Sequence, residues 1–347
     1  MSDKKTVGVI GAGSFGTVVA NLLAPNRTVY LYVRKAEQVE EMRLKKISSN
    51  QILHDNIIPV DDLALVAEKC KLIFPVVPSQ NFKEMIQSIA PYLKPDHILI
   101  HGTKGLALKG KGKKSLQEKG IIAKEHVLTM SQLIAKESVV IRIGCLAGPN
   151  LSKEMAKGLP AATVLASRFD EVILKGQAAL KSERFQVYGS QDIFGVELAG
   201  VLKNILAIGS GVVSGLELGE NARALLITKG LAEIITLTKA MGAEVKSFLG
   251  LAGIGDIIAT CTSPTSRNFT VGYRLAKGER IEQIVESMEE TAEGVNTLNI
   301  AHGLANYYSI NCPIITSLHK GIFENLSIEA GMSYLMKYNF SRDVEFI

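Results

Sequence analysis

Glycines near the start of the chain have the spacing of a phosphate-binding turn. Gly11, Gly13 and Gly16 follow an apolar run at 6–10 and precede a segment of helical periodicity at 17–23. In this arrangement the first glycine permits a tight turn, the second lets a pyrophosphate approach the backbone, and the third allows close helix–strand packing. The N–H groups of the helix N-terminus then face an anion. Because the motif lies between a predicted strand and a predicted helix, it predicts a dinucleotide-binding site.

A cation follows the second predicted strand, at 28–33. A dinucleotide fold specific for NAD usually has Asp or Glu at this position, where the carboxylate binds the ribose 2′-hydroxyl. Here Arg34 and Lys35 occupy the position, and the nearest acid is Glu37. Since a guanidinium suits a 2′-phosphate, we expect NADPH to be accepted beside NADH. The alternative is that Arg34 is only a solvated charge at the end of a strand.

Two lysines have surroundings that suit carbonyl chemistry. Lys104 lies between glycines after a predicted strand at 97–101, and Lys203 lies in an apolar helical segment at 197–205. An ammonium group can stabilise the negative charge that develops on a carbonyl oxygen, and it can donate a proton there. The alternative for Lys104 is a solvated loop lysine. For Lys203 it is an ammonium that snorkels to the surface.

A polar set occurs late in the chain. Asp256 ends a glycine-rich stretch, and Thr260 follows one helical turn later, on the same face if the segment is helical. Ser266, Arg267 and Asn268 form a hydrogen-bonding group in which the guanidinium can bind a phosphate with two parallel bonds. The alternatives are a helix N-cap for Asp256 and a surface ion pair for Arg267. Behind a dinucleotide fold, their joint occurrence favours a substrate site.

Predicted strands and helices alternate along the first part of the chain and then give way to helices alone. The alternation is typical of an α/β fold with an N-terminal Rossmann-type doubly wound sheet. From Asp192 onward the apolar residues recur only at helical spacing. We therefore predict a dinucleotide-binding domain over residues 1–189 and an all-helical substrate domain over residues 190–347. Pro75 argues against a fully paired central position for the strand at 72–77. Strands are expected at 6–10, 28–33, 72–77, 97–101, 127–130, 139–147, 161–166 and 186–188, helices at 36–45, 82–93, 222–241, 281–288, 297–307 and 317–323, and irregular chain at 46–59.

The composition excludes several function classes. With 47% apolar and 21% charged residues, the chain has the balance of a soluble globular protein. No uninterrupted apolar run reaches the roughly 18 residues of a membrane span, and the first residues lead directly into a strand, so we expect no signal peptide. The net charge of +5 comes from lysines interleaved with acids, which favours small anionic ligands over nucleic acid. The histidines and cysteines lack metal-ligand spacing, so we expect no metal, reduced thiols and a cytoplasmic protein. The cysteines are Cys70, Cys145, Cys261 and Cys312.

Ten short motifs occur in order along the chain, and they include the glycine turn, both lysines and the late polar set. They lie at 11–17, 77–80, 103–106, 148–149, 202–204, 221–224, 251–256, 260–262, 266–268 and 293–294. A chain with these motifs resembles the NAD(P)-dependent glycerol-3-phosphate dehydrogenases of the bacterial type along almost its whole length. The resemblance implies reduction of dihydroxyacetone phosphate to sn-glycerol 3-phosphate, which supplies the backbone of glycerophospholipids.

The resemblance also implies residue roles. Lys203 matches the catalytic lysine of the family, Lys104 matches a lysine that touches both cofactor and substrate, and we assign Asp256 to orienting the site. Substrate positions are matched by Gly148, Asn150, Asp256, Thr260, Ser266, Arg267 and Asn268, and cofactor positions by Gly11, Gly13, Ser14, Phe15, Gly16, Arg34, Ser152, Arg267, Thr291 and Glu293. The chain departs from the family at Asn150, where a hydroxyl residue is common, and at Ser152, where alanine is common. The segment 50–59 follows the family pattern only loosely, and the segment 121–140 is longer than is typical of the family.

Two rival functions share parts of this pattern. A reductase for another small acid, such as a 3-hydroxy acid or ketopantoate, would have the same architecture and a lysine in its cleft. A non-enzymatic cofactor sensor would bind NADPH without turnover, and it would leave Lys104, Lys203 and Asp256 unexplained. The apolar helices of the second domain are compatible with a homodimer.

Overall fold

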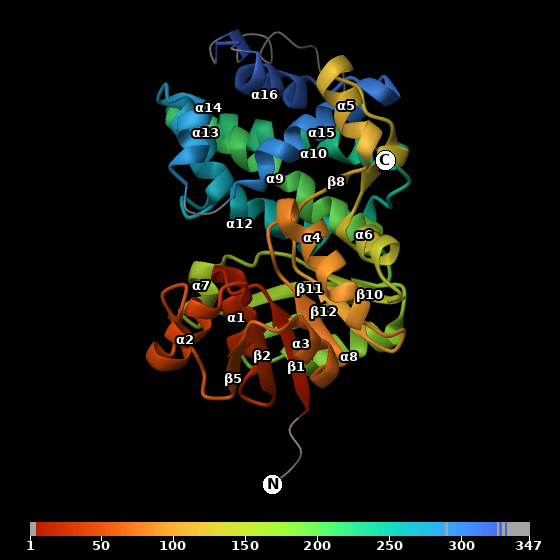
Figure 1. Ribbon diagram of the computed structural model, residues 1–347. Coiled ribbons are helices and arrows are strands. Elements are labelled where there is room, and N and C mark those ends of the chain that lie inside the picture. The colour runs from red at the N-terminus through yellow and green to blue at the C-terminus, as the bar shows by residue number, and fades with distance from the viewer. Residues whose placement is uncertain (1–4, 289–290, 325, 328–329, 332–347) are drawn as a thin grey trace. The chain divides into compact units, whose positions relative to one another are not determined.

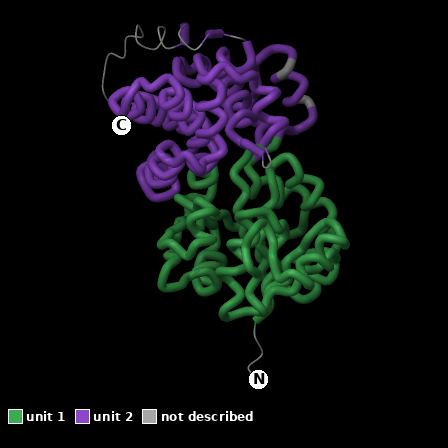
Figure 2. The backbone as a smooth tube through the Cα atoms, turned by 90° about the vertical axis from the view of Figure 1, so that its left-hand side faces the viewer, with its two compact units in different colours: residues 1–107, 129–197 green, residues 108–128, 198–347 purple. Residues whose placement is uncertain are grey.

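The chain folds into two compact units. The computed structural model describes residues 5–288, 291–324, 326–327 and 330–331. One unit comprises Met1–Ala107 and Thr129–Glu197, and the other comprises Leu108–Leu128 and Leu198–Ile347 (Figure 2). The single boundary expected after residue 189 therefore differs from this division in two respects. The division falls eight residues later (197 − 189), and a segment from the middle of the chain belongs to the helical unit.

The inserted segment joins the helical unit through close packing on one helix. Gly303, on helix α15 (Glu293–Tyr308), accepts a 3.1 Å hydrogen bond at its carbonyl oxygen from the Ile122 N–H. A Cβ at Gly303 would overlap the Leu116 side chain and lie 3.0 Å from Ile122. Hydrophobicity patterns along the chain do not reveal this contact, because its partners are more than 180 residues apart.

The first unit is built on an eight-stranded sheet in the order β12-β11-β10-β7-β6-β1-β2-β5 (Figure 1). All neighbouring strands are parallel except β10 and β11, so the predicted Rossmann-type sheet is confirmed, with two strands at one edge reversed. Helices α1 and α8 contact each other, and α3, α4 and α6 form a second group. The strands are β1 (Thr6–Ile10), β2 (Thr28–Tyr32), β5 (Ile57–Val60), β6 (Leu72–Pro75), β7 (Ile98–His101), β10 (Arg142–Ala147), β11 (Ala161–Ser167) and β12 (Phe185–Ser190), and the helices are α1 (Ser14–Leu23), α2 (Ala36–Lys45), α3 (Leu63–Lys69), α4 (Ser79–Ile89), α6 (Met130–Glu137), α7 (Ser152–Ala156) and α8 (Asp170–Leu180).

The position of strand β6 shows that the prediction drawn from Pro75, of a strand away from the centre of the sheet, is wrong. The strand lies in the middle of the sheet, between β1 and β7. Pro75 is its last residue, and the Pro75 carbonyl still accepts a 3.1 Å hydrogen bond from the Gly102 N–H. The missing proline N–H is tolerated because the strand ends there.

Two other segments differ from the prediction. The stretch at 46–59 is ordered, since β3 (Ile47–Ser48) and β4 (Gln51–Ile52) form an antiparallel hairpin before β5. The strand predicted at 127–130 is the short β9 (Val127–Leu128), which pairs with β8 (Ala107–Leu108) in a separate two-stranded sheet. Both small sheets join segments too short to carry a clear alternating pattern.

The second unit is helical, as predicted, apart from the β8–β9 pair. Its central helix is α9 (Ile193–Gly215), whose first five residues belong to the first unit. Helix α9 crosses α13 (Arg267–Ala276) at a point where a Cβ on Gly211 or Gly272 would overlap the backbone of the other helix. Helix α9 is long and apolar enough by composition to cross a membrane, but 94% of its most apolar window is buried inside the fold, as in a core helix.

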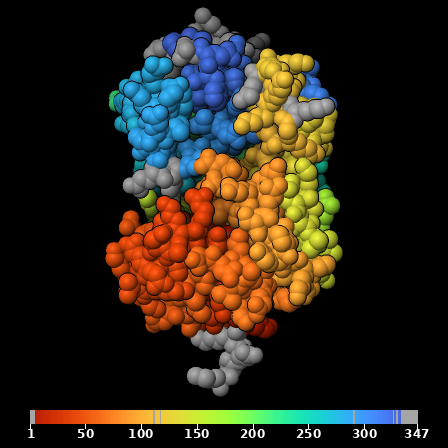
Figure 3. All heavy atoms as spheres, viewed as in Figure 1, coloured from red at the N-terminus to blue at the C-terminus, as the bar shows by residue number. Residues whose placement is uncertain are grey.

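The lysine-rich α5 lies on the surface in the view of Figure 3, where it is yellow. The other helices are α5 (Gly110–Lys119), η2 (Lys124–His126), α10 (Gly219–Ala240), α11 (Lys246–Leu249), the π-helical turn η3 (Leu251–Gly255), α12 (Asp256–Thr262), α13 (Arg267–Ala276), α14 (Ile281–Glu286), α15 and α16 (Pro313–Phe323).

Candidate active site

The glycine-rich turn follows β1, and each of its glycines has a separate structural reason. Gly11 has φ +111°, and a Cβ there would lie 2.7 Å from the Val76 carbonyl oxygen. A Cβ on Gly16 would overlap the Gly11 carbonyl oxygen, so α1 can pack closely only because Gly16 has no side chain. Around Gly13 a Cβ would meet nothing within 4 Å, which leaves room for a ligand beside the backbone. These residues fit the pyrophosphate of a dinucleotide.

The first turn of α1 and the end of β2 adjoin this glycine turn. Ser14 and Phe15 are the first two residues of α1, and Gly13 is its N-cap. The Gly11 N–H donates to the Tyr32 carbonyl oxygen at 3.2 Å, which brings the end of β2 beside the turn. Arg34 follows two residues later and is exposed, so its guanidinium can meet a ligand.

Lys104 meets a second turn of the same unit. Its ammonium Nζ donates to the Gly148 carbonyl oxygen at 3.0 Å, since β7 and β10 are neighbours and both end at this edge of the sheet. Gly148 has φ +145°, a conformation that L-residues rarely adopt. The Asn150 amide donates to the Thr163 hydroxyl at 2.9 Å. Its Oδ1 is buried without a hydrogen-bond partner among the described residues, so it remains an acceptor.

Ser152, a predicted cofactor residue, lies at the start of a short helix of the first unit. It is the first residue of α7, and Leu151 is the N-cap. The Ser152 side chain is half-buried. Ser152 lies near the Gly148 turn because it follows Asn150 by two residues in the chain.

Lys203 is held by two side chains of α12. Its ammonium lies 2.9 Å from the Asp256 carboxylate, and the two side chains are 6% and 2% exposed. Lys203 also donates to the Thr260 hydroxyl, which donates in turn to Asp256 Oδ1 at 3.0 Å. The segment is helical, so the prediction that Asp256 and Thr260 share a face is confirmed. The snorkelling alternative for Lys203 and the N-cap alternative for Asp256 are both wrong, because Gly255 is the N-cap and the ammonium is buried.

The turn before Asp256 leads into α12, which packs against α9. Leu251–Gly255 is a π-helical turn, a form that often occurs at functional sites. A Cβ on Gly253 would overlap the Phe248 backbone, so the tight turn requires glycine there. Farther along, the Ser210 hydroxyl donates to the Cys261 carbonyl oxygen at 2.7 Å and fixes α12 against α9.

The polar group at 266–268 begins α13, and it contacts the start of α15. Ser266 is the N-cap of α13, and its hydroxyl accepts from the Phe269 N–H at 3.4 Å. Arg267 is exposed, and it donates to the Thr291 carbonyl oxygen at 3.5 Å. Asn268 Oδ1 accepts from the Gly294 N–H at 2.9 Å, which leaves the Asn268 amide as a donor.

This contact extends to the residue after Lys203. A Cβ on Gly294 would lie 3.0 Å from the Asn204 carbonyl oxygen and 2.6 Å from Asn268 Oδ1. Glu293, a predicted cofactor residue, is the first residue of α15. These contacts connect α9, α12, α13 and α15 within the helical unit. The predicted residues on these helices or directly before them are Lys203, Asp256, Thr260, Ser266, Arg267, Asn268, Thr291 and Glu293.

Sequence reasoning missed a buried ionisable cluster in the first unit. Glu197 Oε1 lies 3.0 Å from His101 Nε2, and the two side chains are 3% and 2% exposed. Glu197 also accepts from the Ser131 N–H at 2.9 Å and from the Ser131 hydroxyl. Burial opposes ionisation, but His101 and Ser131 outweigh it and hold the pKa of the Glu197 carboxyl below its ordinary value. No local sequence motif predicts this cluster, because its members lie far apart in the sequence.

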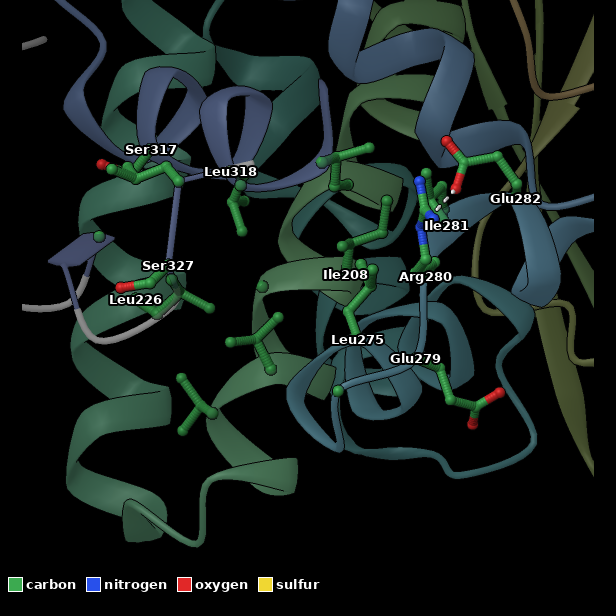
Figure 4. A pocket seen from close by; sticks show the side chains of 18 residues that line it. Ile208, Leu226, Leu275, Glu279, Arg280, Ile281, Glu282, Ser317, Leu318 and Ser327 are labelled. Atoms are coloured by element: carbon green, nitrogen blue, oxygen red, sulfur yellow. Dashed lines mark ion pairs between the residues drawn. The ribbon is translucent and has the colours of Figure 1, made fainter. Parts of the chain in front are cut away.

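A cavity of about 280 Å³ lies elsewhere in the helical unit (Figure 4). Its lining comes from α9, α10, α16, the end of α13, the start of α14 and the loop between these two helices. The lining is mainly apolar, with Ile208, Leu226, Leu275 and Leu318 among its residues. None of the predicted site residues lines it. The chemistry predicted from the sequence therefore does not lie in this cavity.

Two family models match the chain. The model described as NAD-dependent glycerol-3-phosphate dehydrogenase N-terminus matches residues 6–173, and the corresponding C-terminus model matches residues 192–333. Among curated proteins the chain is similar to the NAD(P)+ glycerol-3-phosphate dehydrogenase of Pseudomonas putida. The two are 40% identical over 352 aligned positions, which cover 100% of this chain and 98% of the relative. The enzyme of the same name from Pseudomonas aeruginosa is 38% identical over 353 positions, with 100% and 98% coverage.

Comparison with solved structures supports the same family. The structure of glycerol-3-phosphate dehydrogenase from Coxiella burnetii matches with a TM-score of 0.86 and 32% identity, covering 96% of this chain and 99% of that one. A ketopantoate reductase from Ralstonia eutropha matches with a TM-score of 0.55 and 13% identity, covering 95% and 99%. The second likeness is one of fold alone.

Proposed function

We propose roles for individual residues from the premise that this chain belongs to the NAD-dependent glycerol-3-phosphate dehydrogenase family. The protein is an oxidoreductase that uses NAD or NADP, and its reaction is the reduction of dihydroxyacetone phosphate to glycerol 3-phosphate. The ketopantoate rival is supported only by a likeness of fold. The sensor rival leaves the buried Lys203–Asp256 pair without a purpose.

The pair of Lys203 with Asp256 carries the proposed mechanism. The dinucleotide, when bound, supplies a hydride for the carbonyl carbon. As the carbonyl oxygen gains negative charge, the Lys203 ammonium stabilises it and donates the proton that completes the alcohol. Asp256 and Thr260 orient the ammonium, since their oxygens contact Nζ in a site from which water is largely excluded.

The start of α13 is the proposed phosphate site. Arg267 offers an exposed guanidinium that can form two parallel bonds to a phosphate. The bond from the Gly294 N–H to Asn268 Oδ1 orients the side chain and leaves its NH2 group as a donor, which is what an anion requires. Binding the remote phosphate would orient the carbonyl and so contribute to the rate. Ser266 lies beside them as the helix N-cap.

The remaining assignments concern the cofactor and the edge of the sheet. We assign the pyrophosphate to the glycine turn with Ser14 and Phe15, and a 2′-phosphate to Arg34. Lys104, Gly148 and Asn150 form a second polar group, for which the 3.0 Å bond from Lys104 to Gly148 is the support. Ser152, Thr291 and Glu293 are also assigned to the cofactor.

Turnover with matched substrates tests the function. Purified protein should oxidise NADPH or NADH with dihydroxyacetone phosphate, and it should lose most activity with unphosphorylated dihydroxyacetone or with ketopantoate. The control for Lys203→Met is Lys239→Met, an exposed lysine on α10. Near-normal turnover of Lys203→Met would overturn the central assignment. Tight NADPH binding without turnover on any substrate would instead favour the sensor.

We also propose a cytoplasmic location and a homodimer. All four cysteines are free and buried, and burial raises the pKa of Cys70, Cys261 and Cys312 to about 12, so these thiols stay protonated and unreactive. This arrangement suits a reducing compartment. Light scattering on the purified chain measures the oligomeric state directly.

A further inference from the structure

The β3–β4 hairpin is fastened to the glycine-rich turn by hydroxyl groups. Ser48 and Ser49 donate to the Ala12 carbonyl oxygen at 3.1 and 2.9 Å. Thr17, from α1, approaches the same oxygen at 3.3 Å and shares a 2.9 Å hydrogen bond with Ser48. Thr17 and Ser48 are 0% and 6% exposed, so the bond between them is shielded from water, whereas the Ser49 hydroxyl lies at the surface. One backbone oxygen of the turn thus has three hydroxyls around it.

The hairpin is itself held in one register. Its two tip residues, Ser49 and Asn50, have φ of 45° and 59°, the conformation of a tight two-residue turn. The Gln51 amide donates to the Ser14 carbonyl oxygen at 3.0 Å. The Asn21 amide donates to the Ile52 carbonyl oxygen at 2.9 Å. The hairpin is therefore anchored to the first two turns of α1 as well as to Ala12.

The anchored carbonyl sets the direction of the next N–H. Because a trans peptide is planar, the C=O of Ala12 and the N–H of Gly13 point in opposite directions. Holding the oxygen toward the hairpin therefore holds the Gly13 N–H away from it. Gly13 is also the glycine of the turn with open space around it, where a pyrophosphate can approach.

We propose that Ser48 and Ser49 are positioning residues for dinucleotide binding, since they orient the Ala12–Gly13 peptide so that its N–H faces the pyrophosphate. The inference rests on the family's use of a dinucleotide and adds a role for a segment outside the glycine motif. Ser48 itself is buried and acts through the backbone. The hydrogen bond from Ser48 fixes the Ala12–Gly13 peptide before the ligand binds. Without it, the Gly13 N–H would be free to rotate with its peptide plane.

The test is a set of dissociation constants for NADPH, measured by nicotinamide fluorescence, which no tryptophan of this chain obscures. A net hydrogen bond corresponds to about a two- to tenfold change in an equilibrium constant. We expect Ser48→Ala to weaken NADPH binding about fivefold and Ser48→Ala with Ser49→Gly about twentyfold. Glycine at 49 keeps the positive φ without strain while it removes the hydroxyl. Ser48→Thr keeps a hydroxyl and should restore binding to within about twofold.

Controls separate positioning from a general loss of structure. Ile52→Ala changes a side chain on the same hairpin that is 79% exposed, and it should leave the dissociation constant unchanged. ADP-ribose, which contains the pyrophosphate without the nicotinamide, should weaken by the same factor as NADPH. At saturating NADPH, kcat and the KM for dihydroxyacetone phosphate should stay at wild-type values, while the KM for NADPH rises.

Two results would overturn the proposal. One is a folded Ser48→Ala, Ser49→Gly variant that binds NADPH and ADP-ribose as tightly as the wild type. The other is a Ser48→Thr variant as weak as Ser48→Ala. If Ser48→Ala does not fold, Ser49→Gly alone decides, because Ser49 is exposed and its replacement leaves the buried bonds intact. Failure of the wild-type protein to bind any dinucleotide would instead refute the cofactor assignment.

Discussion

Removing the charge of Lys203 tests both the stability and the chemistry of the buried pair. Lys203→Met keeps the length and apolar stem of the side chain but deletes the ammonium. Asp256→Asn keeps the shape of its side chain but deletes the negative charge. Each single change leaves one buried charge without its partner, since the two side chains are 6% and 2% exposed and 2.9 Å apart. The double variant leaves neither charge.

The expected sizes follow from this burial. Breaking a buried ion pair from one side costs about 3–5 kcal/mol of the free energy of unfolding, mostly from the unpaired charge. Removing both charges avoids that term, so the double variant should be less destabilised than the sum of the singles by about 2–3 kcal/mol. For catalysis, loss of the proton donor should lower kcat by about a thousandfold. Asp256→Asn should lower kcat by about a hundredfold, because the ammonium remains but is less well held.

Urea unfolding at neutral pH measures the stabilities, and NADPH oxidation measures kcat. The matched control is the exposed pair of Lys175 with Glu171 on α8, whose charged atoms are 2.6 Å apart while the side chains are 56% and 44% exposed. Its coupling energy should be too small to measure, because solvent screens an exposed pair. Additive losses at Lys203 and Asp256 would refute the reasoning, as would an Asp256→Asn variant with wild-type kcat.

Three further predictions use other parts of the structure. Glu233 accepts from the Ile314 and Ile315 N–H groups at 2.8 and 3.0 Å, and burial raises its pKa from 4.5 to about 7. Between these values the folded chain binds more protons than the unfolded chain, so the free energy of unfolding should fall by about 3 kcal/mol as the pH rises through this window. Urea midpoints should show this slope in the wild type and lose it in Glu233→Gln. Gly16→Ala should cost about 2 kcal/mol of stability in the same assay, because its Cβ would overlap a carbonyl oxygen, whereas Gly13→Ala should fold normally and weaken NADPH binding in fluorescence titrations. Arg34→Ser should raise the KM for NADPH about tenfold and leave that for NADH unchanged, and equal changes for both cofactors would contradict the 2′-phosphate assignment.

Predictions from the sequence succeeded where the physical signal is local. The helix at 36–45 was predicted with its observed bounds, and the strand at 6–10 likewise. Both depend on periodicity and flanking residues within about one turn or one strand. The failures were long-range. The strand containing Pro75 was predicted to avoid the centre of the sheet, and its place there depends on neighbours that periodicity does not identify.

The sequence by itself determined the glycine turn, the order of the motifs and the apolar helix that contains Lys203. These features need only neighbouring residues or a recognisable order along the chain. The tertiary structure alone decided which groups Lys203 meets, that the Asn268 oxygen is occupied by Gly294, and that a hairpin is fastened to Ala12. Lys203 and Thr260 are 57 positions apart, and no local propensity acts over that distance. Such pairs form only when the packing of whole helices brings them within hydrogen-bonding distance.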